Sequence, residues 1–188
     1  YELDKSKGVI NNLLSVTDKI LFISCENALF KASIKDTLDT LSGSLSIKQG
    51  DLFDRKPDEL IPDDLGYISN NNTFATFVCK YGCFIIDNIH GKIYLIGDNI
   101  EDITPEGGIS FLQSHLPNTG EDNPFTGTGV AAVYDDVTER ILISITNRVV
   151  DQNGNGSSIV SAGDTIALNS FTLSYNVRHK LWVAFHDY

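Results

Sequence analysis

One segment of this chain has spacing close to that of a metal-binding motif. It is the run Asp151-x-Asn153-x-Asn155, followed by a glycine. Oxygen-bearing side chains at alternate positions before a Gly-forced turn are typical of the start of a calcium loop. The bidentate acid that closes such a loop should stand at position twelve, which is Ala162 here, and Asp164 comes two residues too late. The pattern therefore favours a hairpin tip in which Asn and Gly adopt left-handed turn conformations, with calcium binding as the alternative.

Two acidic dipeptides, Asp87-Asn88 and Asp135-Asp136, could be read as sources of the paired carboxylates of a glycosidase. They recur at one position in successive predicted hairpins, which favours a turn role, because Asx side chains hydrogen-bond their own backbone. No HExxH or GxSxG motif accompanies the four histidines. The sequence thus predicts no catalytic residue, no enzymatic activity and no cofactor.

The three cysteines, Cys25, Cys79 and Cys83, make an odd number, which argues against a disulfide framework. A zinc ion at Cys79 and Cys83 would need two further ligands, and His90 is the one candidate close in sequence. We expect free, buried thiols.

The elements that position these residues are repeated hairpins. Residues 84–95, 133–143 and 173–183 each contain a hydrophobic strand, a polar turn opened by Asp or Asn, and a second hydrophobic strand with Lys or Arg at or just before its start. Such repetition is typical of β-propellers and related sheet arrays. The sequence predicts an all-β fold of about three antiparallel propeller-like blades, the first of them incomplete, with one short helix.

The predicted organisation has four parts. Residues 1–65 form a partial first blade and an acidic loop, 66–104 a four-stranded blade, 105–128 a short helix and loop, and 129–188 a last blade with a long hairpin loop. The residues from Asp135 to Asn176 could span a further blade, but too few strands fall between them, so Asp135 and Asn176 are expected to open two hairpins of one sheet. The absence of Met and the strand-like final residues indicate a segment of a longer protein.

Aromatic residues gather near the end of the sequence, at Tyr175, Trp182, Phe185 and Tyr188. Strand alternation predicts Trp182 on one side of its strand and Phe185 on the other. A sugar-binding platform is possible here, but packing between blades is favoured, because stacked sheets need large contact areas.

A formal net charge of −11 disfavours nucleic acid and anionic lipid as partners. No apolar run approaches the roughly 20 residues that a membrane helix needs. These features leave protein partners as the expected ones.

Residues 66–188 resemble blades of large bacteriophage tail proteins, through Gly66-Tyr67-Ile68-Ser69, the hairpin 81–95, and the strands around 133–143 and 171–188. The nearest resemblance is to the tail stabilisation (muzzle) proteins of crAss-like phages. It implies a structural virion protein that is made in the host bacterial cytoplasm and located in the tail. It also implies contacts with other virion tail proteins in a ring-forming homo-oligomer. The alternative is a carbohydrate- or receptor-binding propeller module that uses the loop 147–163 and the aromatic residues.

Overall fold

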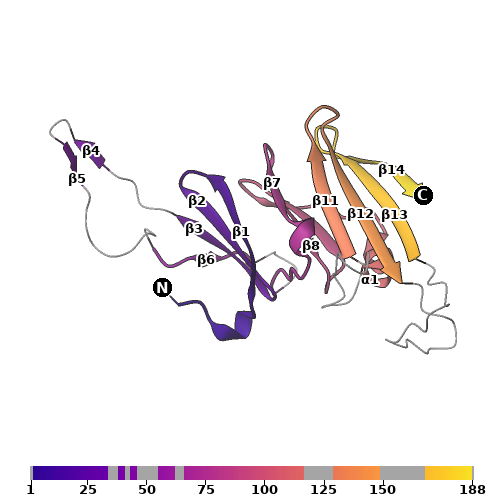
Figure 1. The fold of residues 1–188 in the computed structure, drawn as a ribbon, viewed down its shortest axis with the longest axis horizontal. Coiled ribbons are helices and arrows are strands. Elements are labelled where there is room, and N and C mark those ends of the chain that lie inside the picture. The colour runs from indigo at the N-terminus through magenta and orange to yellow at the C-terminus, as the bar shows by residue number, and fades with distance from the viewer. Residues whose placement is uncertain are drawn as a thin grey trace, which may run out of the picture.

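The computed structural model describes residues 2–33, 38–40, 43–45, 55–61, 66–116, 129–148 and 168–187. The strands within these ranges form three four-stranded antiparallel sheets and one two-stranded hairpin. Figure 1 shows the three sheets standing side by side in chain order. The predicted all-β class with blade-like sheets and a short helix is confirmed.

Sheet 1 contains β1 (Ile10–Thr17), β2 (Ile20–Cys25), β3 (Ala28–Ser33) and β6 (Asp58–Glu59), in that order. A 3-10 turn, η1 (Lys5–Lys7), precedes β1, and the hairpin of β4 (Leu38–Thr40) and β5 (Gly43–Leu45) is inserted before β6. The first blade was expected to be incomplete, yet β6 supplies a fourth strand by pairing with β3. Two charged residues carry no strand periodicity, so the sequence pattern did not show this strand.

Sheet 2 contains β7 (Phe77–Cys79), β8 (Gly82–Asp87), β9 (Lys92–Ile96) and β10 (Ile100–Asp102), and η2 (Thr73–Ala75) leads into it. Gly82 has φ +134°, and a Cβ there would lie 2.3 Å from the carbonyl oxygen of Ile96. Only glycine fits this close approach between the β7–β8 turn and β9. The short polar β10 forms one edge of this sheet.

Sheet 3 contains β11 (Gly129–Asp135), β12 (Arg140–Arg148), β13 (Leu168–Asn176) and β14 (Leu181–Asp187). β12 pairs with β13 along its whole length, so both predicted hairpins belong to one sheet. The helix α1 (Gly108–His115) lies between sheets 2 and 3 in the chain, within the predicted helical segment.

The β8–β9, β11–β12 and β13–β14 turns are built alike. Each begins at an Asx residue whose cross-strand partner stands five positions later. The residue before that partner has a left-handed backbone in all three turns, at Gly91, Glu139 and Lys180. The third turn differs in the position of its basic residue. In the first two turns the cross-strand partner of the Asx residue is basic, at Lys92 and Arg140. In the third turn that partner is Leu181, and the basic residue Lys180 takes the left-handed position before it.

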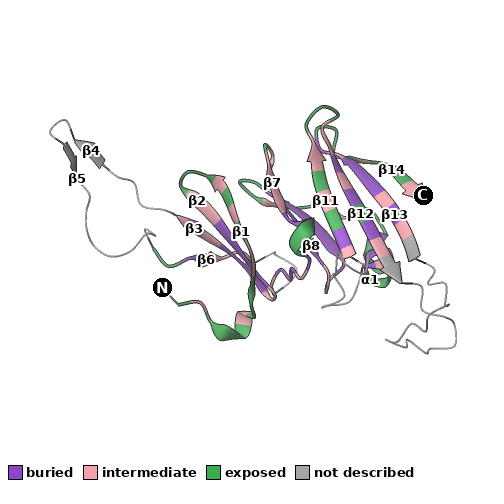
Figure 2. Cartoon of the chain, in the orientation of Figure 1, coloured by how far each residue is buried: buried purple, intermediate pink, exposed green. Residues whose placement is uncertain are grey.

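Two hydrophobic clusters join the sheets through opposite faces of sheet 2. One face, with Phe84 and Ile86, packs against Ile141, Ile143 and other residues of sheet 3 and against α1. The other face, with Ile85 and Tyr94, packs against Phe22 and Leu29 of sheet 1. This double burial leaves every residue of β8 and β9 buried. Figure 2 shows purple, buried strand beside the β8 label.

The first strand of each sheet lies nearest to its neighbours. β1 contacts β7, β7 contacts β11, and η2 contacts β11. The last strands, β6, β10 and β14, lie at the opposite edges of their sheets. Each sheet is therefore a blade-like meander that runs from an edge near its neighbours to an opposite outer edge.

Candidate functional site

The Asx residues that open the repeated turns bind their own backbone. Asp87 Oδ1 accepts a hydrogen bond from the His90 amide at 2.9 Å, and Asn176 Oδ1 accepts one from the His179 amide at 2.9 Å. Asp135 Oδ1 accepts one from the Val137 amide at 2.9 Å. The turn role predicted for these residues is confirmed, since each Asx side chain accepts an amide of its own hairpin.

Asp135 is also bonded by the Thr138 hydroxyl, and this bond holds the pKa of its carboxyl below the usual value. The residue therefore favours its charged form, whereas a general acid needs a raised pKa. Asp135 has the electrostatics of a turn cap.

Asp87 and His90 form the one arrangement in the described residues that resembles part of a catalytic group. Asp87 is fully buried, and its Oδ2 lies 2.7 Å from His90 Nδ1 and accepts the Ser69 amide at 3.0 Å. The ring of Tyr67 packs edge-on against the imidazole, with centroids 5.0 Å apart. An acid that orients a histidine is two thirds of a triad, but within the described residues no hydroxyl or thiol is hydrogen-bonded to this imidazole. The pair closes a turn and anchors residue 69.

A polar segment, residues 69–76, links sheet 1 to the start of sheet 2 and buries Ser69, Asn70, Asn72 and Thr76, and we call it the polar strap. Asn70 is its centre: Nδ2 donates to Ser24 Oγ at 2.8 Å and to Thr76 Oγ1 at 2.7 Å, while Oδ1 accepts the Asn72 amide at 3.1 Å. The Asn70 amide donates to Glu26 O at 3.2 Å. The strap thus connects β2, the β2–β3 turn and the start of sheet 2. The sequence pattern did not single out these asparagines.

A second polar group joins the turns of sheets 2 and 3, and we call it the rim clasp. Glu139 Oε1 accepts from Lys80 Nζ at 2.8 Å and from the Tyr81 hydroxyl at 3.1 Å. Arg178 NH1 lies 3.7 Å from Glu139 Oε2, and Lys80 Nζ lies 3.3 Å from Asp136. The bond from Lys80 lowers the pKa of Glu139 and raises that of Lys80. The clasp holds neighbouring turns together by charge.

All three cysteines are free thiols, and Cys25 and Cys83 are buried whereas Cys79 is half-buried. Cys79 packs into the cluster between sheets 2 and 3, whereas Cys83 lies in the cluster on the opposite face. Burial raises the pKa of the Cys83 thiol to about 12, so it stays protonated and a poor metal ligand. Within the part of the chain that the structure describes, no group of three His, Cys, Asp or Glu side chains is placed to hold a metal.

The aromatic residues of β14 are placed differently from the sequence expectation. Trp182 pairs with Tyr175 and Ala184 with Ser174, so Val183 is an extra, bulged residue. The bulge turns both Trp182 and Phe185 toward sheet 2 and α1, because an inserted residue reverses the alternation. Trp182 Nε1 donates to Ile103 O at 2.8 Å, and Phe185 stacks on Phe171 at 5.1 Å. Trp182 is therefore a packing residue, in agreement with the prediction that the aromatic residues serve packing.

The calcium candidates Asp151, Asn153 and Asn155 lie outside the described residues, as does the loop from residue 149 to 163. Asn147 and Arg148, the first residues of the predicted binding loop, are the end of β12. Tyr188 is likewise outside the described ranges.

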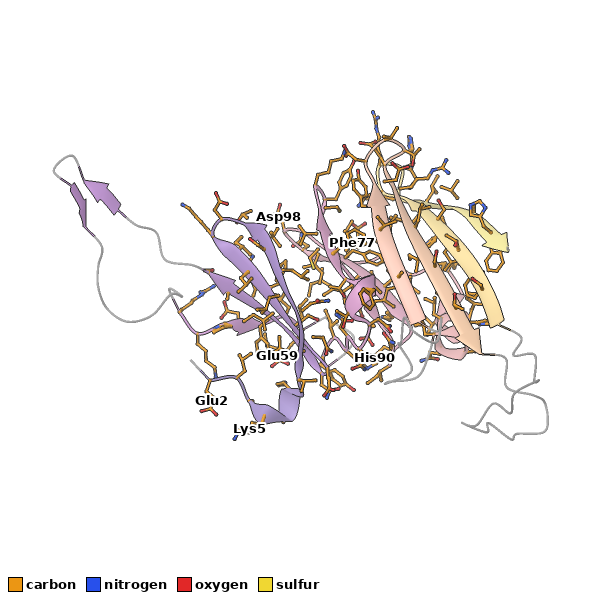
Figure 3. All side chains as sticks on the ribbon, viewed as in Figure 1. Glu2, Lys5, Glu59, Phe77, His90 and Asp98 are labelled. Carbon is orange, nitrogen blue, oxygen red and sulfur yellow. The ribbon has the colours of Figure 1, made fainter. Side chains whose placement is uncertain are left out.

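The surface offers a second kind of candidate site. Large apolar side chains are exposed on the sheets at both ends of the row, at Ile10 and Leu13 of sheet 1 and at Val133, Leu181 and Phe185 of sheet 3. Figure 3 shows side chains projecting from both end sheets. Contiguous exposed apolar patches are typical of protein contact surfaces, and Ile10 and Leu13, which share one face of β1, come nearest to such a patch.

No family model matches this chain, and no curated protein matches it either. The helices of the described ranges include none that is long and apolar enough to cross a membrane.

Proposed function

We propose that this chain is a non-enzymatic structural component of a bacteriophage tail that acts through protein–protein contacts. The observation that carries the proposal is the contrast between its buried and exposed residues. The buried polar groups of the strap are bound to one another and to the sheets, while the two end sheets expose large apolar side chains. Such a molecule is suited to being packed against other proteins.

The resemblance of residues 66–188 to blades of crAss-like phage tail proteins supports the location in the virion tail. The proposed partners are other tail proteins and further copies of this chain arranged in a ring. The net charge of −11 supports protein partners over nucleic acid or membrane.

Purified phage particles provide the test. Peptides of this chain should appear by mass spectrometry in particles purified through a density gradient, and cryo-electron microscopy should place its three sheets in a symmetric ring at the tail. A matched gradient fraction of lysate from uninfected host serves as control. Finding the protein free in the host cytosol and absent from particles would falsify the virion role.

A carbohydrate- or receptor-binding module is the second candidate. It is favoured by the half-exposed ring of Phe185, which stacks on Phe171 and lies beside Phe111. Aromatic faces of this kind can stack on sugar rings. A glycan array should show binding that Phe185→Ala abolishes, and an array at background level would remove this candidate.

A further inference from the structure

The outer edges of the three sheets are protected to different degrees. An edge strand presents unpaired N–H and C=O groups, and proteins protect such edges with short strands and charged residues. β6 is two residues long and both are acidic, and β10 is three residues long and includes Glu101 and Asp102. β14 is seven residues long, and its run from Leu181 to His186 contains no Asp, Glu, Lys or Arg. β14 is therefore the outer edge that lacks both protections.

The backbone of β14 is paired on one side only. β13 pairs with it from Phe171 to Asn176, and within the part of the chain that the structure describes no strand pairs with its other side. A bulge at Val183 bends the first half of β14, whereas the ladder is regular from Ala184 to Asp187. This second half offers a regular row of backbone donors and acceptors to a further strand.

The apolar side chains of β14 are exposed on both faces of sheet 3. Phe185 is 55% exposed on the face toward α1, where it stacks on Phe171. Leu181 is 61% exposed and lies on the opposite face, because its partner Asn176 follows the inward-facing Tyr175. A sheet packed on one face would cover only one of these two residues, whereas a strand added at the edge lies beside both.

We propose that β14 pairs edge to edge with β14 of a second copy of this chain, in antiparallel orientation, so that two four-stranded sheets become one sheet of eight strands. A twofold axis relates the copies, and each contributes the same strand. Contacts of this kind are held by main-chain hydrogen bonds, and the flanking side chains give specificity. The inference deepens the proposed contact with further copies of this chain, and it rests on that proposed function.

Charge favours a second copy in antiparallel orientation. Lys180 stands directly before β14 and Asp187 ends it. Lys180 bonds Glu101, yet its side chain is 66% exposed. Antiparallel pairing directs the basic start of each strand toward the acidic end of the other, whereas parallel pairing would bring like charges together. Residues 129–148 and 168–187 together carry four acidic and four basic side chains, so two copies of sheet 3 approach without net repulsion.

The oligomeric state in solution tests the pairing. Light scattering after size exclusion at about 100 µM should give twice the chain mass of 20.7 kDa. Phe185→Lys places a charge on the edge strand of both copies and should give a monomer. Val133→Lys is the matched control, because Val133 is 57% exposed on the same sheet but lies on the inner strand β11, and it should leave the dimer intact.

Amide hydrogen exchange of the wild-type chain is a second measurement, and it needs no substitution. In the peptide that contains Leu181–Asp187, exchange should be slower at about 100 µM than at about 1 µM, because pairing bonds the outward amides of β14. The peptide that contains Asp58–Glu59, at the outer edge of sheet 1, is the internal control and should exchange at one rate at both concentrations.

Circular dichroism of both lysine variants checks that they fold. A wild-type chain that stays monomeric at about 100 µM would overturn the pairing and leave the β14 edge to a strand of another tail protein. A folded Val133→Lys variant that is monomeric would place the contact on the outer face of sheet 3, and a dimer without slower exchange in β14 would place it elsewhere, so either result would also overturn the pairing. The virion role is decided separately, because the particle experiment detects the chain whatever its state in solution.

Discussion

Asn70→Ala is the substitution that should damage the fold most for the smallest change in volume. Asn70 is 1% exposed and forms three side-chain hydrogen bonds, to Ser24, Thr76 and the Asn72 amide. The truncation removes all three bonds and leaves the buried Asn72 amide without this acceptor. The strap then loses its attachment to sheet 1.

The size of the effect follows from the bonds. Each hydrogen bond contributes about 1 kcal/mol net, and a buried donor left without a partner costs about 1–3 kcal/mol. Because the two hydroxyls can reorient while the Asn72 amide cannot, we expect a loss of about 3–4 kcal/mol. For a chain of this size that corresponds to a fall in Tm of about 10 °C.

Urea denaturation followed by tryptophan fluorescence measures the loss. Asn71→Ala is the matched control, because Asn71 is half-buried and makes one 3.3 Å bond to Ser69 Oγ, so it should lose less than about 1 kcal/mol. Asn70→Asp keeps the volume but removes both donors, and it should be at least as unstable as Asn70→Ala. Equal, small losses for Asn70→Ala and Asn71→Ala would refute the strap as a structural connector.

Four further predictions concern the turns and the sheet contacts. Gly91→Ala should lower the free energy of unfolding by more than about 1–2 kcal/mol, since φ is +65° and the new Cβ would lie 2.8 Å from Ile109 O. Lys180→Gly should have the opposite effect and raise Tm, because it relieves a left-handed backbone strain of the same kind. Trp182→Phe removes the hydrogen bond to Ile103 O and should lower the free energy of unfolding, measured by urea denaturation, by about 1–2 kcal/mol. An unchanged midpoint would contradict the packing role of Trp182. The pKa of Glu139 is lowered in the folded state, so this residue stabilises the fold at pH values above its unfolded pKa of about 4.5. The stabilisation is lost as the pH falls through the folded pKa. Glu139→Gln should therefore flatten the acid limb of a curve of Tm against pH.

The sequence was sufficient to predict the regular parts of the fold. Alternating hydrophobic runs separated by Asx turns correctly indicated β8, β9 and all four strands of sheet 3, because each run has a partner close along the chain. The prediction that Asp135 and Asn176 open two hairpins of one sheet is confirmed by the β12–β13 ladder.

Features that depend on distant contacts could not be predicted in this way. β6 is a strand only because β3 offers it an edge, and the bulge at Val183 exists only in the pairing with β13. The strap was also missed, since asparagines are typical of loops and only burial between two sheets makes Asn70 structural.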